Sequence, residues 1–240
     1  VAADYNRIPL LREMNADLDT PLSIYLKLAS ESNIYLFESM QGGEKWGRYS
    51  LIGLSTNKLL KLTGDHLQII ADGHIQTDLK SSDPLGEIQK FKDSFRVPEL
   101  PNMPRFTGGL VGYFGYDSVR YVEKKLAIST PPDQMNIPDV MLLVSEELII
   151  FDNLAGTITL VVHADPSVPD AFRHFNRRLD LLETKLASSS VNPFDMTIRH
   201  QKVSEDSFVS SFGEERYKEA VRKIKDYTIA GDIMQVVPSQ

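Results

Sequence analysis

Cysteine is absent from the sequence, which excludes disulfide bonds and thiolate metal sites and fits a protein of a reducing compartment. No apolar run approaches the roughly 18 residues that a membrane-spanning helix needs, and Val1 to Leu10 lack the pattern of a signal peptide. Basic runs are also missing, and the formal net charge of −7 argues against nucleic acid and anionic membranes as partners. These absences together predict a soluble, cytoplasmic protein.

The composition that remains is typical of a globular protein. The 240 residues are 42% hydrophobic and 25% charged, which is enough to form one large domain or two small ones around a sizeable core. His66 and His74 lie near predicted turns, and no carboxylate cluster at ligand spacing accompanies them. We therefore expect no metal site within this chain.

Short apolar segments separated by turn residues predict strands. Asp72-Gly73 lies between two such segments and is a two-residue hairpin signal, so we expect an antiparallel meander there. A second hairpin is expected around the polar stretch 152–156. The predicted strands span residues 34–37, 49–54, 58–63, 66–71, 74–77, 106–116, 140–151 and 157–163.

Helical signals occur between these strands. Thr20 is a candidate N-cap with Pro21 at the first helical position. Ser167 and Asp170 have the spacing of a capping box before a long apolar seam, and Gly231 is a natural C-terminal cap. The fold class is therefore α+β, with antiparallel sheets flanked by helices. Predicted helices begin at residues 21, 84, 117, 167 and 214.

The character of the sequence changes after residue 186. Residues 187–213 are mostly polar with little periodicity, which is typical of a linker or a surface crossing between two lobes. We therefore predict an N-terminal lobe at residues 1–186, a linker at 187–213 and the start of a second lobe at 214–240. Within that second lobe, the segment from Asp232 onward is expected to begin a strand.

A glycine-rich segment at residues 106–116 has a superficial likeness to a nucleotide-binding loop. It lacks the Lys-Ser/Thr ending of a phosphate loop and the helical continuation of a dinucleotide fingerprint. Glycines within a strand more often mark bulges or places where another backbone approaches closely. We therefore expect a strand here and no nucleotide site.

The most unusual stretch runs from Tyr35 to Gly53, where two apolar runs flank a polar, glycine-containing loop. Glu38 ends the first run, and a carboxylate close to a core costs several kcal/mol unless a cation or hydrogen-bond donors satisfy it. Arg48 across the loop is one candidate partner. The other is a ligand ammonium group, with Ser39 and the loop amides binding the carboxylate of the same ligand. The second alternative describes a free amino acid.

Several separated motifs resemble those of one family. Leu36-Phe37-Glu38-Ser39, followed by the stretch 47–53, resembles the N-terminal signature of anthranilate synthase large subunits, which are chorismate-binding enzymes, with Phe37 in place of the usual Leu. Matching stretches follow at 19–23, 108–123 and 231–240. The resemblance implies that residues 1–186 form a regulatory lobe that binds the feedback inhibitor tryptophan, through Thr20, Pro21, Glu38, Ser39, Arg48, Tyr49 and Ser50.

The resemblance also implies an activity for the whole protein. Enzymes of this kind convert chorismate and ammonia into anthranilate and pyruvate, with Mg²⁺ as cofactor and a glutamine amidotransferase subunit that supplies the ammonia. Gln235 matches the position at which water-adding relatives carry a general-base lysine, and a neutral amide cannot deprotonate water. Gln235 therefore favours addition of an amine. Residues 214–240 would begin the catalytic domain, with the metal ligands beyond Gln240.

Two other functions stay open at this point. Aminodeoxychorismate synthase component I, of the folate pathway, shares chorismate, Mg²⁺ and a glutaminase with the first candidate. A non-catalytic amino-acid-binding module is compatible with a regulatory lobe alone. The loop at residues 42–50 and the segment 231–237 resemble anthranilate synthase more closely than its folate-pathway relative.

Overall fold

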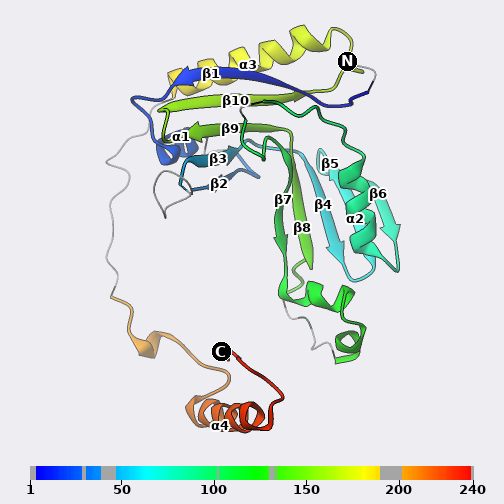
Figure 1. The fold of residues 1–240 in the computed structure, drawn as a ribbon, viewed down its shortest axis with the longest axis vertical. Helices are drawn as coiled ribbons and strands as arrows, with labels where there is room; N and C mark the ends of the chain where they lie inside the picture. The colour runs from blue at the N-terminus through cyan, green and yellow to red at the C-terminus, as the bar shows by residue number, and fades with distance from the viewer. Residues whose placement is uncertain are drawn as a thin grey trace. The chain divides into compact units, whose positions relative to one another are not determined.

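The computed structural model describes residues 4–28, 31–38, 47–101, 103–129, 133, 135–189 and 202–238. The chain divides into two compact units, residues 1–191 and 192–240. The first unit holds two β-sheets and the helices that cover them (Figure 1).

Both sheets have five strands, and every neighbouring pair runs antiparallel, which confirms the predicted fold class. The first sheet has the order β1 (Ile8–Asn15), β10 (Thr157–Ala164), β9 (Glu147–Asp152), β3 (Tyr49–Gly53) and β2 (Tyr35–Phe37). The second has the order β6 (His74–Lys80), β5 (His66–Ala71), β4 (Lys58–Thr63), β8 (Val140–Ser145) and β7 (Gly109–Phe114).

Helices cover both sheets. In the first sheet, α1 (Pro21–Leu28) packs on β2 and β3, and α3 (Ala171–Ser188) packs on β1 and β10. In the second, α2 (Pro84–Asp93) packs on β5, and the amide of Gly86 donates to the Asp83 carboxylate at 3.0 Å as the predicted start of this helix requires. Two 3₁₀ helices follow β7, at Tyr116–Tyr121 and Lys124–Ser129.

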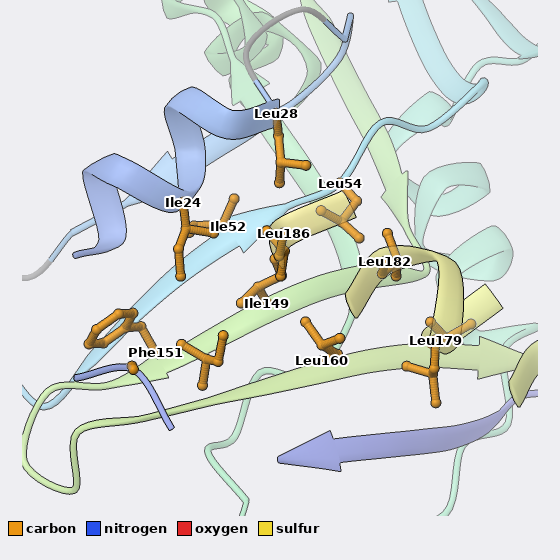
Figure 2. Packing of buried hydrophobic residues seen from close by; sticks show 13 residues of the cluster. Ile24, Leu28, Ile52, Leu54, Ile149, Phe151, Leu160, Leu179, Leu182 and Leu186 are labelled. Atoms are coloured by element: carbon orange, nitrogen blue, oxygen red, sulfur yellow. The ribbon is translucent and has the colours of Figure 1, made fainter. Parts of the chain in front are cut away.

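The main core lies between the first sheet and its two helices. Figure 2 shows Ile24 and Leu28 of α1 and Leu179 of α3 facing Ile149 and Leu160 of the sheet, and all five side chains are buried. Strand β9 is buried on both faces, because Leu148 and Ile150 belong to a second cluster on the opposite side of the sheet. A continuous apolar run from 148 to 151 is the sequence pattern expected of such a strand.

One predicted strand is wrong. The apolar run 140–151 forms two strands in different sheets, β8 and β9, and the chain passes from one sheet to the other at Glu146. The crossing is fixed by polar contacts: the Glu146 carbonyl accepts from the backbone amide of His163 at 2.9 Å, and its carboxylate pairs with Arg7. Apolar periodicity alone does not show where such a run changes sheet.

The predicted capping box before α3 is also wrong. Ser167 donates to the carboxylate of Asp165 at 2.6 Å, and the helix begins after Asp170, which has a left-handed backbone and makes no side-chain cap bond. Two basic residues of this helix form ion pairs with other parts of the unit, Arg178 with Glu147 at 2.8 Å and Lys185 with Glu31.

The glycine-rich segment confirms the expectation of close backbone approach. A Cβ atom at Gly112 of β7 would lie 1.9 Å from the carbonyl oxygen of Met141 in the neighbouring β8, so no larger residue fits there. The two-residue hairpin is also present, since Asp72 and Gly73 both have positive φ angles, 51° and 76°.

The second unit contains α4 (Glu214–Ala230), which ends at Gly231 with φ 83° as predicted. The strand expected from Asp232 onward is wrong for the part that the structure describes, because residues 232–238 have no strand pairing and Gln235 is exposed. A strand needs a partner for its amides and carbonyls. The predicted linker at 187–213 lies partly outside the described residues, and the predicted division into lobes stays a prediction.

We predict that Leu160→Ala destabilises the first unit by about 2–5 kcal/mol, because Leu160 is fully buried between the sheet and both helices. Urea unfolding followed by circular dichroism measures the change. Leu18→Ala is the matched control, since Leu18 is 99% exposed and its loss should change the unfolding free energy by less than about 0.5 kcal/mol. Equal effects of the two substitutions would contradict this core.

Candidate functional site

The start of α1 is a reciprocal cap. The amide of Ser23 donates to the hydroxyl of Thr20 at 3.1 Å, and the amide of Thr20 donates to the hydroxyl of Ser23 at 2.9 Å, which confirms Thr20 as the N-cap. Pro21 is the first helical residue. Ser23 also donates to Asp19 at 2.7 Å, and Lys27 pairs with the same carboxylate. Thr20 is therefore fixed in place by the helix that it caps.

Glu38 lies just after β2 and is exposed. The expectation that its carboxylate sits close to the core is wrong, because β2 has only three residues and forms the edge of its sheet. No described residue forms an ion pair or hydrogen bond with Glu38, and Arg48 is engaged elsewhere. Ser39, the next predicted ligand residue, lies outside the described residues.

Arg48 is held by a residue that sequence reasoning missed. Its guanidinium donates to both oxygens of Asp152, with N–O distances of 3.0 and 2.6 Å to one oxygen and 3.1 Å to the other. These hydrogen bonds hold the pKa of Asp152 below its usual range. The same guanidinium lies over the ring of Tyr49, 4.9 Å from its centroid. Of the two partners considered for Glu38, the structure therefore removes the one within the protein.

Ser50 is buried, at 2% exposure, and belongs to the same cluster. The side-chain amide of Asn153 donates to the Ser50 hydroxyl at 3.3 Å and to the Gly47 carbonyl at 3.1 Å. The backbone amide of Asn153 donates to the Arg48 carbonyl at 2.8 Å. The turn after β9 therefore holds the whole segment 47–50.

The structure brings the predicted tryptophan residues together only in part. Arg48, Tyr49 and Ser50 form one cluster at the start of β3, whereas Thr20 and Pro21 start the helix that packs on β2 and β3. Asp152 and Asn153 were missed because they lie more than a hundred residues away from their partners. Their position in a polar turn between two apolar strands was the available signal.

Two cavities lie elsewhere in the first unit, and both are lined by Arg7, Glu146 and His163. The smaller has a volume of about 360 Å³ and is also lined by residues 55–57, Glu147, Asp165, Phe175 and Arg178. The larger, which we call the inter-sheet cavity, has a volume of about 690 Å³. Its other lining residues are Lys92, Asp93, Phe95, Val97, Pro98, Glu99, Leu100, Met103, Pro104, Arg105, Thr107, Gly108, Gly109, Leu110, Val144 and Ser145.

Within the described part of the chain, no group of three or more His, Asp or Glu residues is arranged to hold a metal ion. None of the helices described is long and apolar enough to span a bilayer. Gln235, the residue matched to the catalytic position, is exposed in the second unit.

Comparisons with known proteins show the family of this chain. Residues 21–240 match the model of the family described as chorismate binding enzyme, so the chain belongs to that family. It is 48% identical over 239 residues to anthranilate synthase component 1 of Pseudomonas putida, covering 100% of this chain and 48% of the relative. The corresponding protein of Pseudomonas aeruginosa is 50% identical over 241 residues, covering 100% and 49%. The chain thus spans about half the length of the curated relatives it matches.

A further relative comes from Acetivibrio thermocellus, an anthranilate synthase component 1 that is 32% identical over 244 residues, with 100% of this chain and 49% of the relative covered. Among solved structures, the crystal structure of anthranilate synthase component I from Streptococcus pneumoniae aligns with a TM-score of 0.48 and 18% identity. That alignment covers 91% of this chain and 46% of the other.

We predict that Asp152→Asn lowers stability at pH 7 but not in acid. The folded-state pKa of Asp152 is depressed, so its ionised form stabilises the fold above the unfolded-state pKa of about 4, and this contribution is lost as pH falls through the folded-state pKa. Urea midpoints of wild type and variant should therefore differ at pH 7 and converge at low pH. Asp17→Asn is the control, since Asp17 is exposed and has no ion pair within the described chain. A difference that persists unchanged into acid would contradict the charge-based explanation.

Proposed function

We propose that this chain is part of an anthranilate synthase component I, which converts chorismate and ammonia into anthranilate and pyruvate for tryptophan biosynthesis. The observation that carries the proposal is the similarity of the entire chain, at 48–50% identity, to proteins of that name from two Pseudomonas species. The relatives with 47–48% identity from Neisseria carry the same name. No observation favours the aminodeoxychorismate synthase alternative.

We assign catalysis to the part of the enzyme that corresponds to the other half of the relatives, which this chain does not span. The described residues offer no group of three or more His, Asp or Glu side chains that could hold Mg²⁺. The only catalytic residue proposed within the chain is Gln235, whose neutral amide does not activate water. This residue type is compatible with ammonia as nucleophile, which needs no general base once it arrives in its free form. We also propose that the enzyme is located in the cytoplasm and receives its ammonia from a glutamine amidotransferase partner.

We further propose that tryptophan inhibits the enzyme through the first unit. The exposed position of Glu38 leaves its carboxylate accessible to a ligand ammonium group. Because Arg48 is already paired with Asp152, its proposed part is to position the segment 47–50 near the ligand. Inhibition requires tryptophan to prefer the inactive state of the whole enzyme, and a coupling free energy of about 1–3 kcal/mol is typical of such regulation.

The activity is tested with a chimera in which residues 1–240 are joined to the matching second half of the Pseudomonas aeruginosa relative. We expect the chimera to form anthranilate from chorismate, Mg²⁺ and ammonia, measured by anthranilate fluorescence. Residues 1–240 alone should show no turnover at any Mg²⁺ or ammonia concentration. Turnover by residues 1–240 alone would contradict the assignment of chemistry to the other half, and a chimera that folds but forms no anthranilate would contradict the proposed function.

We predict that Ser39→Phe in the same chimera abolishes inhibition by tryptophan and leaves the uninhibited rate within about twofold of wild type, because a bulky ring occupies the ligand's place without touching the catalytic half. Inhibition curves with tryptophan and phenylalanine measure the effect. Ser32→Phe is the matched control, since Ser32 is exposed and lies before β2, outside the residues proposed to bind the ligand. Ordinary sensitivity to tryptophan in Ser39→Phe would count against the site.

A further inference from the structure

The inter-sheet cavity lies where the two sheets of the first unit join. Its lining includes Leu110 of β7, Val144 of β8 and His163 of β10, and its wall is completed by the connector that follows α2. Its volume of about 690 Å³ falls within the range of small-molecule sites. None of the residues predicted to bind tryptophan lines it.

His163, which lines both cavities, has one ring nitrogen without a hydrogen-bond partner among the described residues. His163 is 6% exposed, and its Nδ1 lies 3.0 Å from the carbonyl oxygen of Glu146. A carbonyl only accepts hydrogen bonds, so Nδ1 carries the proton and Nε2 is left as an acceptor. No described residue donates to Nε2. Burial lowers the pKa of His163, which favours this neutral form at neutral pH.

The ring also has a tight neighbour. A Cβ atom at Gly108, which lines the same cavity, would lie 2.5 Å from Cε1 and 3.0 Å from Nδ1 of His163. A side chain at this position would therefore displace the imidazole ring. Glycine at 108 allows the ring to pack at the cavity wall.

The charged residues that line the cavity are balanced in number, and one cation and one carboxylate among them have no ion pair with a described residue. Three cations and three carboxylates line it, and Arg7 is paired with Glu146 and with Asp165, while Lys92 lies 3.7 Å from Asp93. Arg105 has no ion pair with any described residue, and Glu99 likewise has none. A ligand carboxylate would satisfy Arg105, whereas a second one would meet the repulsion of the lining acids.

We propose that the inter-sheet cavity binds a small monoanionic carboxylate that has a compact apolar body and an O–H or N–H donor. The donor bonds to Nε2 of His163, the carboxylate pairs with Arg105, and the body packs against side chains such as Phe95, Met103, Leu110 and Val144. The site is distinct from the proposed tryptophan residues and does not depend on the proposed enzyme activity.

Three matched probes test the proposal on the 240-residue chain. 4-Hydroxybenzoate has the ring, the carboxylate and the donor, benzoate lacks the donor, and 5-hydroxyisophthalate carries a second carboxylate. We expect 4-hydroxybenzoate to bind with a Kd of about 1 mM, as suits a ligand of this size. Benzoate should bind about fivefold more weakly through loss of one hydrogen bond, and the dicarboxylate more weakly still. Titrations followed by amide NMR shifts of residues that line the cavity measure all three.

Variants separate the two contacts. His163→Phe keeps a ring but removes the acceptor, so it should abolish the difference between 4-hydroxybenzoate and benzoate. Arg105→Gln, at an exposed position, should weaken both by a similar factor. His74→Gln and Arg222→Gln are controls at exposed residues outside the cavity, and neither should change the affinities.

The proposal is overturned if 4-hydroxybenzoate causes no saturable shifts at the lining residues up to 20 times the expected Kd of about 1 mM. Equal affinity for benzoate and 4-hydroxybenzoate in the wild type would overturn the role of His163. Because Arg105→Gln changes only an exposed side chain, the proposal stays testable even if His163→Phe fails to fold.

Discussion

The first unit depends on the passage of the chain from one sheet to the other at Glu146. Its carbonyl oxygen accepts from the backbone and the ring of His163, while its carboxylate pairs with Arg7. On either side, Ser145 forms a hydrogen bond of 2.8 Å with the hydroxyl of the half-buried Tyr35, and Glu147 pairs with Arg178. These contacts tie three consecutive residues to β2, β10, α3 and the segment before β1. Glu146, at the centre of this junction, lines both cavities.

The candidate effector site depends on a different constraint, the position of β2 at the edge of its sheet. Residues at an edge have a neighbour on one side only, so the side chains at its end reach solvent. This explains why Phe37 is 52% exposed although it lies in an apolar run. It also places Glu38 at the surface and not against the core. The start of β3 is by contrast fully supported by the turn at Asp152 and Asn153.

Local signals in the sequence were sufficient for most elements. Thr20, Asp83 and Asp72-Gly73 each act through bonds or dihedral angles within three residues, so their roles could be predicted without a structure. Most of the failures involve distant partners; the capping box before α3 is the exception, because Ser167 bonds to Asp165 two residues away. The change of sheet at Glu146 requires Arg7 and His163, the cluster around Arg48 requires Asp152, and the exposure of Glu38 requires the strand order. None of these pairings produces a periodic pattern in a single sequence. The unpaired acceptor atom of His163 cannot be predicted from such a pattern either.

The register of β1 has a consequence for synthesis of the protein. Ile8 to Asn15 pair with Thr157 to Ala164, so the first strand made waits for the last strand of the unit before it finds its only neighbour in the sheet. Contacts between residues so far apart in sequence slow folding, because the intervening chain must be ordered first. At a ribosome adding about 5–20 residues per second, the roughly 150 residues between the two strands would leave β1 unpaired for about 7 to 30 seconds. Its polar residues Arg12, Glu13 and Asn15 suit a strand that must avoid aggregation before it is paired.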